Sequence, residues 1–265
     1  MDKLLNNMTL DEEVIEWLRC VAPSHTVRVG FSGGKDSVVL LDLCRRAGIN
    51  HEAHYAYTPM DPPELKAFIK RYDGVMVEKP ERSFIACIRK HAIMPTRSRR
   101  WCCEDWKHGG GDMDTTILGI RREESAKRSN RRRIEQCNKQ PGRVFINPIL
   151  DWTTTDVWNY IRERNLRTCE LYREGWTRIG CVLCPMTRDT ERQMARWPGM
   201  ARLWQRAAQE VWRIHTERGH EKAATWQDLW RWWLDRDADQ YPDADVPDLF
   251  CQPEGTLVFG EATSE

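Results

Sequence analysis

The feature that most constrains the fold of this sequence is a short apolar run that stops at two adjacent glycines and gives way to a helical pattern. The run, TVRVGF, covers residues 26–31, and the segment SGGKDS follows it at residues 32–37. An apolar run rich in β-branched residues predicts a buried strand, and the pattern from about Asp36 to Ala47 predicts a helix. We therefore expect a strand, a tight turn and a helix, in that order.

The alternation of strand and helix continues along the chain. HEAHYAY and GVMVE predict two further strands, and each is followed by a helical pattern, PPELKAFIKRY and SFIACIRKHA. TTILGI and VFINPI predict two more strands, separated by the arginine-rich segment REESAKRSNRRRIEQ, which we expect to be a loop or an exposed helix. Strands that alternate with helices form parallel sheets. The sequence thus predicts an α/β fold with a doubly wound, mostly parallel sheet and a helical C-terminal part.

The loop SGGKDS has the composition of a phosphate-binding site. Backbone N–H groups and the helix dipole at a strand-to-helix turn attract anions, and adjacent glycines let phosphate oxygens approach the main chain. A lysine neutralises charge, serine hydroxyls donate hydrogen bonds, and an aspartate helps to hold Mg²⁺. The alternative is a glycine turn that only caps a helix. The residues predicted to bind phosphate are Ser32, Gly33, Gly34, Lys35, Asp36 and Ser37.

Four of the ten cysteines form two pairs, an arrangement that indicates a shared metal site. Cys102 and Cys103 are adjacent, and Cys181 and Cys184 form a Cys-x-x-Cys motif. Four thiolates suit either tetrahedral zinc or an iron–sulfur cluster. Side chains of adjacent residues diverge, which favours separate irons of a cluster over one zinc ion. Reduced cysteines without any metal are the remaining alternative.

Basic residues flank the first cysteine pair. Arg99, Arg100 and Lys107 favour thiolates and are placed to orient a cluster near an anionic ligand.

Taken together, these motifs resemble the phosphoadenylylsulfate (PAPS) reductase family of the PP-loop, adenine nucleotide α-hydrolase-like fold. The resemblance runs from about Val27 to Pro185 and includes FSGGKDS, YTPMDPPE, GIRREES, NPILDWTTTDVWNYI and LYREGWTRIGCVLCP. It implies that the four paired cysteines bind a 4Fe-4S cluster. It also implies that the PP-loop holds the phosphates of ATP with Mg²⁺, or the phosphosulfate of an adenylyl sulfonucleotide.

The resemblance also implies roles in the site for further residues. Arg121 and Arg122 match positions that contact the anionic ligand, so we expect Lys35, Asp36 and these two arginines to be catalytic. Tyr57 and Thr58 are expected near the adenosine pocket. The family's reductases carry a nucleophilic cysteine in a Glu-Cys-Gly-Leu-His tail, and this chain lacks that motif, which puts reduction in doubt.

Three functions follow. The first is ATP-dependent, pyrophosphate-releasing activation of a substrate or sulfur transfer to an acceptor, served by a sulfur donor. The second is a sulfonucleotide reductase that uses Cys251 as nucleophile and a reductant protein such as thioredoxin. The third is a non-enzymatic module whose basic run, residues 121–133, binds nucleic acid or another partner. The acceptor, the donor and the oligomeric state are not readable from the sequence.

The organisation of the chain follows from these motifs. We expect an N-terminal helix, a PP-loop nucleotide-binding and iron–sulfur domain, a tryptophan-rich helical region and an irregular tail, at residues 1–25, 26–185, 186–240 and 241–265. The tryptophans are expected to pack in a helical core rather than to stack on bases. Thr9 and Glu12 predict a capping box for the first helix.

Net charge, the first residues and the hydropathy of the chain indicate the cellular compartment. Lys and Arg number 41 against 40 Asp and Glu, so the net charge of +1 provides no global attraction for nucleic acid. The first residues carry acidic side chains where a signal peptide would be basic, and no apolar stretch approaches a membrane span. We therefore expect a cytoplasmic protein without a membrane partner, in which thiols stay reduced.

Overall fold

The computed structural model describes residues 8–107, 113–137, 141–220 and 223–235. Six strands form one sheet in the spatial order β3-β2-β1-β4-β6-β5. Five of them run parallel, and β5 runs antiparallel to β6 at one edge. The strands are β1 Val27–Gly30, β2 His51–Ala56, β3 Val75–Glu78, β4 Thr115–Ile117, β5 Ile134–Gln136 and β6 Val144–Ile146. The predicted doubly wound, mostly parallel sheet is confirmed.

The strand order places a topological switch point between β1 and β4. From β1 the chain moves outward through β2 to β3, and it then returns to pair β4 with the other side of β1. In open α/β sheets, ligands bind outside the carboxyl ends of the strands at such a point. The loop that follows β1 is Ser32–Gly34, and the loop that follows β4 leads to Arg121. The topology therefore brings two predicted site segments to one place.

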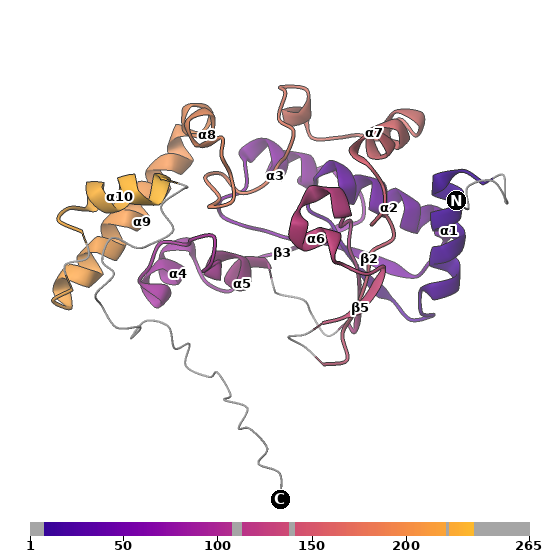
Figure 1. The fold of residues 1–265 in the computed structure, drawn as a ribbon, viewed down its shortest axis with the longest axis horizontal. Helices are drawn as coiled ribbons and strands as arrows, with labels where there is room; N and C mark the ends of the chain where they lie inside the picture. The colour runs from indigo at the N-terminus through magenta and orange to yellow at the C-terminus, as the bar shows by residue number, and fades with distance from the viewer. Residues whose placement is uncertain (1–7, 108–112, 138–140, 221–222, 236–265) are drawn as a thin grey trace, which may run out of the picture.

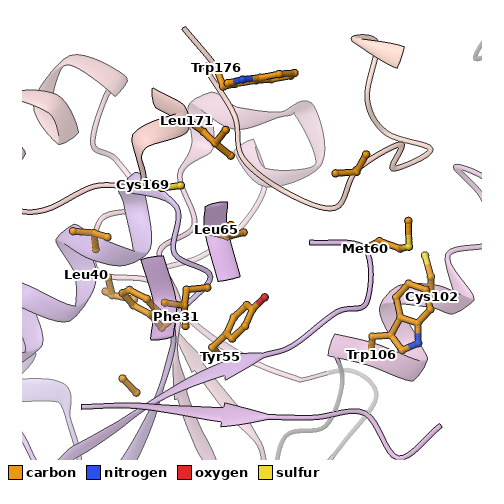
Figure 2. Packing of buried hydrophobic residues seen from close by; sticks show 14 of the residues in the cluster. Phe31, Leu40, Tyr55, Met60, Leu65, Cys102, Trp106, Cys169, Leu171 and Trp176 are labelled. Atoms are coloured by element: carbon orange, nitrogen blue, oxygen red, sulfur yellow. The ribbon is translucent and has the colours of Figure 1, made fainter. Parts of the chain in front are cut away.

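Helices α1 Leu10–Val21 and α2 Lys35–Ala47 cover one face of the sheet (Figure 1). Helix α1 begins with the predicted capping box, in which the Thr9 N–H donates to Glu12 Oε2 at 2.8 Å. Helix α2 is buried along most of its length, with an apolar face that meets the buried residues of β1 and β2. Figure 2 shows part of this cluster, including Phe31, Leu40 and Leu65.

The remaining helices up to residue 163 connect the strands, except the last, which follows β6. They are α3 Pro63–Lys70, α4 Phe84–His91, α5 Trp101–Lys107, α6 Ala126–Ser129 and α7 Thr154–Glu163. Pro63 stands in the first turn of α3, where its missing N–H costs no hydrogen bond. Two 3₁₀ turns, η1 Arg122–Glu124 and η2 Glu170–Tyr172, lie before α6 and after α7.

The arginine-rich segment corrects one expectation. Besides η1 and α6, it contains strand β5, which the charged sequence did not predict. Ile134 pairs with Ile146 of β6 in antiparallel register, and the Asn147 side chain donates to Glu135 Oε1 at 2.9 Å. Tertiary pairing with β6 therefore creates a strand where alternation of apolar residues is absent.

The C-terminal part is helical, as predicted. Helices α8 Thr190–Arg196, α9 Pro198–Glu217 and α10 Trp226–Leu234 lie together at one end of the molecule (Figure 1), where α9 packs against α4 and α10. The described tryptophans of this part are buried or partly buried; Trp204 is 1% exposed. The predicted tail and Cys251 lie outside the described residues. Across those residues, no helix is both long and apolar enough to cross a membrane.

Candidate functional site

The two glycines of the loop after β1 serve different purposes. Gly33 has φ +73°, and a Cβ there would lie 2.6 Å from Leu65 Cδ1 and 3.0 Å from Ile69 Cδ1 of α3. Backbone conformation and packing both require glycine at this position. A Cβ at Gly34 would meet only ordinary contacts, 3.4 Å from Ser32 Oγ and 3.5 Å from the Tyr172 hydroxyl. The fold itself therefore does not demand glycine at position 34, and the space that the missing side chain leaves is bordered by Ser32 and Tyr172.

Helix α2 begins beside this space with no side-chain cap from Gly34. The first residue, Lys35, is buried, and its ammonium donates to Asp36 Oδ2 at 2.9 Å. The Ser37 hydroxyl donates to the Gly34 carbonyl at 2.8 Å and lies 3.3 Å from Ser32 Oγ. The six predicted phosphate-binding residues thus form one compact turn at the positive end of a 13-residue helix.

Arg121 reaches the same turn from the loop after β4. Its side chain is 2% exposed, and its Nε donates to Asp36 Oδ1 at 2.6 Å. Further bonds to Glu123 and Thr154 hold the guanidinium in place, at 2.8 Å and 3.2 Å. Asp36 therefore bridges the two cations Lys35 and Arg121 across the switch point of the sheet.

Gly119 makes that approach sterically feasible. A Cβ at this position would lie 3.0 Å from the carbonyl oxygen of Asp36, so β4 ends against the first turn of α2. Sequence reasoning did not single out this residue.

Arg122 lies in a different environment. Its Nε donates to Asp151 Oδ1 at 2.7 Å, and its side chain is 42% exposed. Asp151 also accepts from Arg133, at 3.1 Å. The structure brings Arg121 to the loop and places Arg122 in this separate ion pair, so a catalytic role for Arg122 stays a prediction.

Tyr172 joins the loop from η2 and was missed by the sequence prediction. Its hydroxyl accepts a hydrogen bond from the Lys35 N–H at 2.9 Å. Its ring packs edge-on against Trp158 of α7, with a centroid distance of 5.2 Å and an interplanar angle of 87°. The segment LYREGWTRIGCVLCP contains Tyr172, but no local pattern signals that it meets residue 35.

The first cysteine pair lies on α5. Cys102 is buried and Cys103 is partly buried. Figure 2 shows Cys102 and Met60 directed towards each other beside Trp106. The Trp101 indole donates to the Ile93 carbonyl at 3.0 Å, which fixes the beginning of the helix.

The second pair lies on a tight turn locked by hydrogen bonds. The Cys184 N–H donates to the Cys181 carbonyl at 3.2 Å, and the Val182 N–H donates to the Met60 carbonyl at 2.7 Å. Leu183 has φ +57°, a left-handed conformation that costs a non-glycine residue free energy. Its N–H donates to Gln193 Oε1 at 2.6 Å, so the surrounding contacts stabilise the strained residue.

Residues of the loop after β2 contact Cys181. Thr58 is fully buried with its Oγ1 3.3 Å from Cys181 Sγ, and Cys181 Sγ lies 3.5 Å from Asp61 Oδ1. Asp61 is itself buried and accepts from the Tyr55 hydroxyl. Tyr57 is partly buried under Lys66, whose Nζ lies 5.0 Å from its ring centroid. Contacts to adenosine by Tyr57 and Thr58 remain predictions, and Asp61 is a polar site residue that sequence reasoning missed.

Electrostatics tie the two cysteine pairs together. A hydrogen bond with Cys102 lowers the pKa of Cys103 to about 6, helped by Lys107 and Arg100, and raises the pKa of Cys102. Burial raises the pKa of Cys181 to about 12, and Lys107 opposes that shift. The nearby Cys181 raises the pKa of Lys107 in turn, with smaller contributions from Asp61 and the other cysteines. All four thiols therefore act on one another within a single polar environment.

The cysteine pairs supply four soft sulfur donors, which suit an iron–sulfur cluster or zinc. Within the described residues, which include all four cysteines, no group of three or more His, Cys, Asp or Glu side chains is compact enough to hold one metal ion. The 4Fe-4S cluster and the alternative zinc ion both stay predictions.

Tryptophans of the C-terminal helices donate hydrogen bonds to the cysteine turn and to two other segments of the fold. The Trp204 indole donates to the Val182 carbonyl, between the two cysteines of the turn, at 3.0 Å. The Trp233 indole donates to the Pro95 carbonyl at 2.7 Å, and the Trp197 indole donates to Glu64 at 3.0 Å. The helical part thus supports the site as well as forming its own core.

The basic run of residues 121–133 is largely charge-paired. Besides Arg121 and Arg122, Arg128 pairs with Glu124 and Arg131 pairs with Glu135. Lys127 and Arg132 are exposed. Five of the seven cations of the run lie in ion pairs, and binding of nucleic acid there stays a prediction.

Comparison with known proteins gives sequence relatives. An adenosine 5′-phosphosulfate reductase of Bacillus subtilis is 28% identical over 216 residues, 75% of this chain and 90% of the relative. An uncharacterized protein of Methanocaldococcus jannaschii is 29% identical over 226 residues, 80% of this chain and 53% of the relative. This chain therefore spans about half the length of that archaeal protein.

The fold also matches a solved structure. A crystal structure of phosphoadenylyl-sulfate reductase from Candida auris aligns with a TM-score of 0.50 at 20% identity, over 68% of this chain and 91% of that one. Residues 26–187 match the family described as the phosphoadenosine phosphosulfate reductase domain, and they include the phosphate loop, Arg121 and both cysteine pairs. Because this match covers more than half of the chain, the chain belongs to the phosphoadenosine phosphosulfate reductase domain family.

Proposed function

We propose that this protein is an enzyme that binds an adenine nucleotide by its phosphates at Ser32–Ser37 and carries a 4Fe-4S cluster on its two cysteine pairs. Its reaction is ATP-dependent activation with release of pyrophosphate, or transfer of sulfur to an acceptor. Reduction of a sulfonucleotide, which needs a thiolate to attack sulfur, is the second candidate.

The observation that carries the proposal is the cluster at the N-terminus of α2, where Asp36 pairs with both Lys35 and Arg121. Gly34 adjoins this cluster, and a Cβ there would meet its neighbours at ordinary contact distances. A bound phosphate would draw Lys35 away from Asp36 Oδ2, and that oxygen would then be free to ligate Mg²⁺. Arg121 stabilises charge that develops on the phosphate.

The cysteine pairs would hold the cluster, which supplies a site for a sulfur atom or orders the pocket. Cys102 and Cys103 come from α5, and Cys181 and Cys184 come from the locked turn. Lys107 at the end of α5 interacts electrostatically with cysteines of both pairs, Cys103 on one side and Cys181 and Cys184 on the other. In this arrangement it balances part of the negative charge that thiolates and a nucleotide bring together.

Release of pyrophosphate tests the proposed reaction. Protein purified without oxygen is incubated with α-labelled ATP and with RNA, DNA or small acceptors, and pyrophosphate and labelled AMP are measured. We expect pyrophosphate in stoichiometric amounts with the correct acceptor, and Lys35→Ala should lower the rate at least about 100-fold. Failure with every acceptor, despite tight nucleotide binding, would contradict activation by ATP.

The second candidate is a sulfonucleotide reductase, which the relatives named as adenosine 5′-phosphosulfate reductases favour. Cys251, the nucleophile that this function requires, lies outside the described residues. Sulfite release from adenylylsulfate or PAPS with thioredoxin distinguishes the candidates. Production of sulfite by the wild type and its loss in Cys251→Ser would support reduction over ATP-dependent activation.

A further inference from the structure

The hydroxyl of Tyr172 takes the place of a helix cap at the phosphate loop. Lys35 is the first residue of α2, so its N–H belongs to the donors that a helix cannot pair within its own backbone. Gly34 has no side chain to accept from these donors. Tyr172, 137 positions further along the chain, accepts from this N–H instead, at 2.9 Å.

The same hydroxyl has a hydrogen to donate. Burial raises the pKa of the Tyr172 phenol, because a phenolate would be poorly solvated there, so the group remains neutral at physiological pH. No hydrogen-bond acceptor for that hydrogen is found within the part of the chain that the structure describes. The Tyr172 side chain is partly buried, so water can accept this hydrogen, and a bound phosphate would supply a charged acceptor in place of water.

The position of the hydroxyl relative to Gly34 identifies the partner's place. A Cβ at Gly34 would lie 3.5 Å from the Tyr172 oxygen, so the hydroxyl borders the space that the glycine leaves open. The Trp158 ring, perpendicular to the phenol ring, fixes its orientation towards that space. The hydrogen bond to Lys35 therefore holds the Tyr172 hydroxyl beside Gly34, and Trp158 packs against its ring.

We propose that Tyr172 is a ligand-contacting residue of the phosphate site: its oxygen accepts from the Lys35 N–H while its hydrogen is donated to an oxygen of a bound phosphate chain. This inference rests on the proposed nucleotide site and adds a third segment, η2, to it. Because the contact is made to phosphate, it applies equally to ATP and to inorganic pyrophosphate and contributes nothing to adenosine.

Titration calorimetry with ATP and with inorganic pyrophosphate tests this contact. We expect Tyr172→Phe to raise Kd for both ligands about 10-fold, the effect of one lost hydrogen bond to a charged group. Tyr160→Phe is the matched control, since it removes another tyrosine hydroxyl bonded to α2, at Asp42, away from the loop. The control should bind like the wild type, and thermal unfolding should show that both variants are folded.

The outcomes separate the two proposals. Unchanged or tighter binding by Tyr172→Phe overturns the role of Tyr172 and leaves the nucleotide site intact. A wild type that binds neither ligand overturns the nucleotide site and the inference with it. A second measurement needs no variant: in spectra of isotopically labelled wild type, pyrophosphate should shift the Lys35 amide and the Tyr172 ring signals over the same concentration range. A Tyr172 signal that stays unchanged at saturation contradicts direct contact.

Discussion

The phosphate loop and the cysteine site differ in how their parts are distributed along the chain. The loop consists of six consecutive residues, three after β1 and three in the first turn of α2, and much of its geometry comes from its own backbone. The cysteine site joins α5 to a turn near residue 181, and tryptophans from α9 and α10 bond to its supports. A local motif can thus be recognised from residue types, whereas a composite site depends on correct tertiary packing.

The phosphate loop and the cysteine turn also differ in backbone strain. Gly33 adopts a left-handed conformation at no steric cost, but Leu183 adopts one with a full side chain. The turn of Cys181 and Cys184 is therefore held by its neighbours, among them Gln193 and Trp204. We expect the cysteine site to respond to distant substitutions that leave the loop intact.

The largest expected effect tests whether the conformation of the loop depends on packing against α3. Gly33→Ala should lower the free energy of unfolding by about 3 kcal/mol, because backbone strain adds to a clash with Leu65 of α3. Gly48→Ala is the control: φ is +68° there and a Cβ would meet nothing within 4 Å. Denaturant unfolding should give a loss of only about 1 kcal/mol for the control. Equal losses would show that packing on α3 contributes nothing.

The second prediction concerns the support of the cysteine turn. Trp204→Phe should lower the free energy of unfolding by about 2 kcal/mol, since it leaves the buried Val182 carbonyl unpaired and a small cavity. It should also lower the iron content of protein purified without oxygen. Trp212→Phe, which removes a bond to the Ala223 carbonyl away from the cysteines, should retain its iron. Full iron content in Trp204→Phe would separate the cysteine site from the tryptophan support.

The third substitution, unlike the first, is expected to weaken ligand binding and to leave stability nearly unchanged. Gly34→Ala adds a Cβ at ordinary contact distances, so the free energy of unfolding should change by less than about 0.5 kcal/mol. The added methyl group enters the proposed phosphate space, and Kd for ATP should rise about 10-fold, the equivalent of about 1.4 kcal/mol. Calorimetric titration and denaturant unfolding of the same sample measure both. Undiminished affinity would place the phosphates elsewhere.

The smallest effect is a pH dependence at the contact between α4 and α9. Hydrogen bonds from Arg213 and Arg89 lower the pKa of Glu210 to about 2. Since the folded-state value lies below the unfolded one, the stabilisation is complete above the unfolded pKa and is lost as pH falls through about 2. Glu210→Gln should cost at most about 0.5 kcal/mol at pH 7, because solvent screens this pair, and nothing near pH 2. Unfolding curves at the two pH values test this, and a cost that persists at low pH would implicate packing instead.

Sequence reasoning predicted the parts that are encoded locally. The strand before Ser32, the helix up to Ala47 and the capping box at Thr9 all appear, because apolar periodicity and turn residues act over a few positions. The predicted parallel sheet follows from the same alternation. The order of the strands, and thus the meeting of Arg121 with Asp36, becomes visible only in the folded chain.

The features that were missed arise from distant contacts. Strand β5 has a charged sequence and depends on pairing with β6. Tyr172 and Asp61 lie in segments that carry the family resemblance, but their partners, Lys35 and Cys181, are more than 100 positions away along the chain. Burial of Asp61 beside Cys181 is a property of the assembled site, which composition and spacing do not contain.

The switch point between β1 and β4 has a mechanical consequence. Residues 30–91 build one wing of the sheet and residues 115–146 build the other, and along this seam the two wings meet through β1 and β4. An anion bound by Lys35 from one wing and by Arg121 from the other would connect the two wings. Unfolding of either wing would then require release of the anion, so a bound anion should make unfolding of the whole sheet more cooperative.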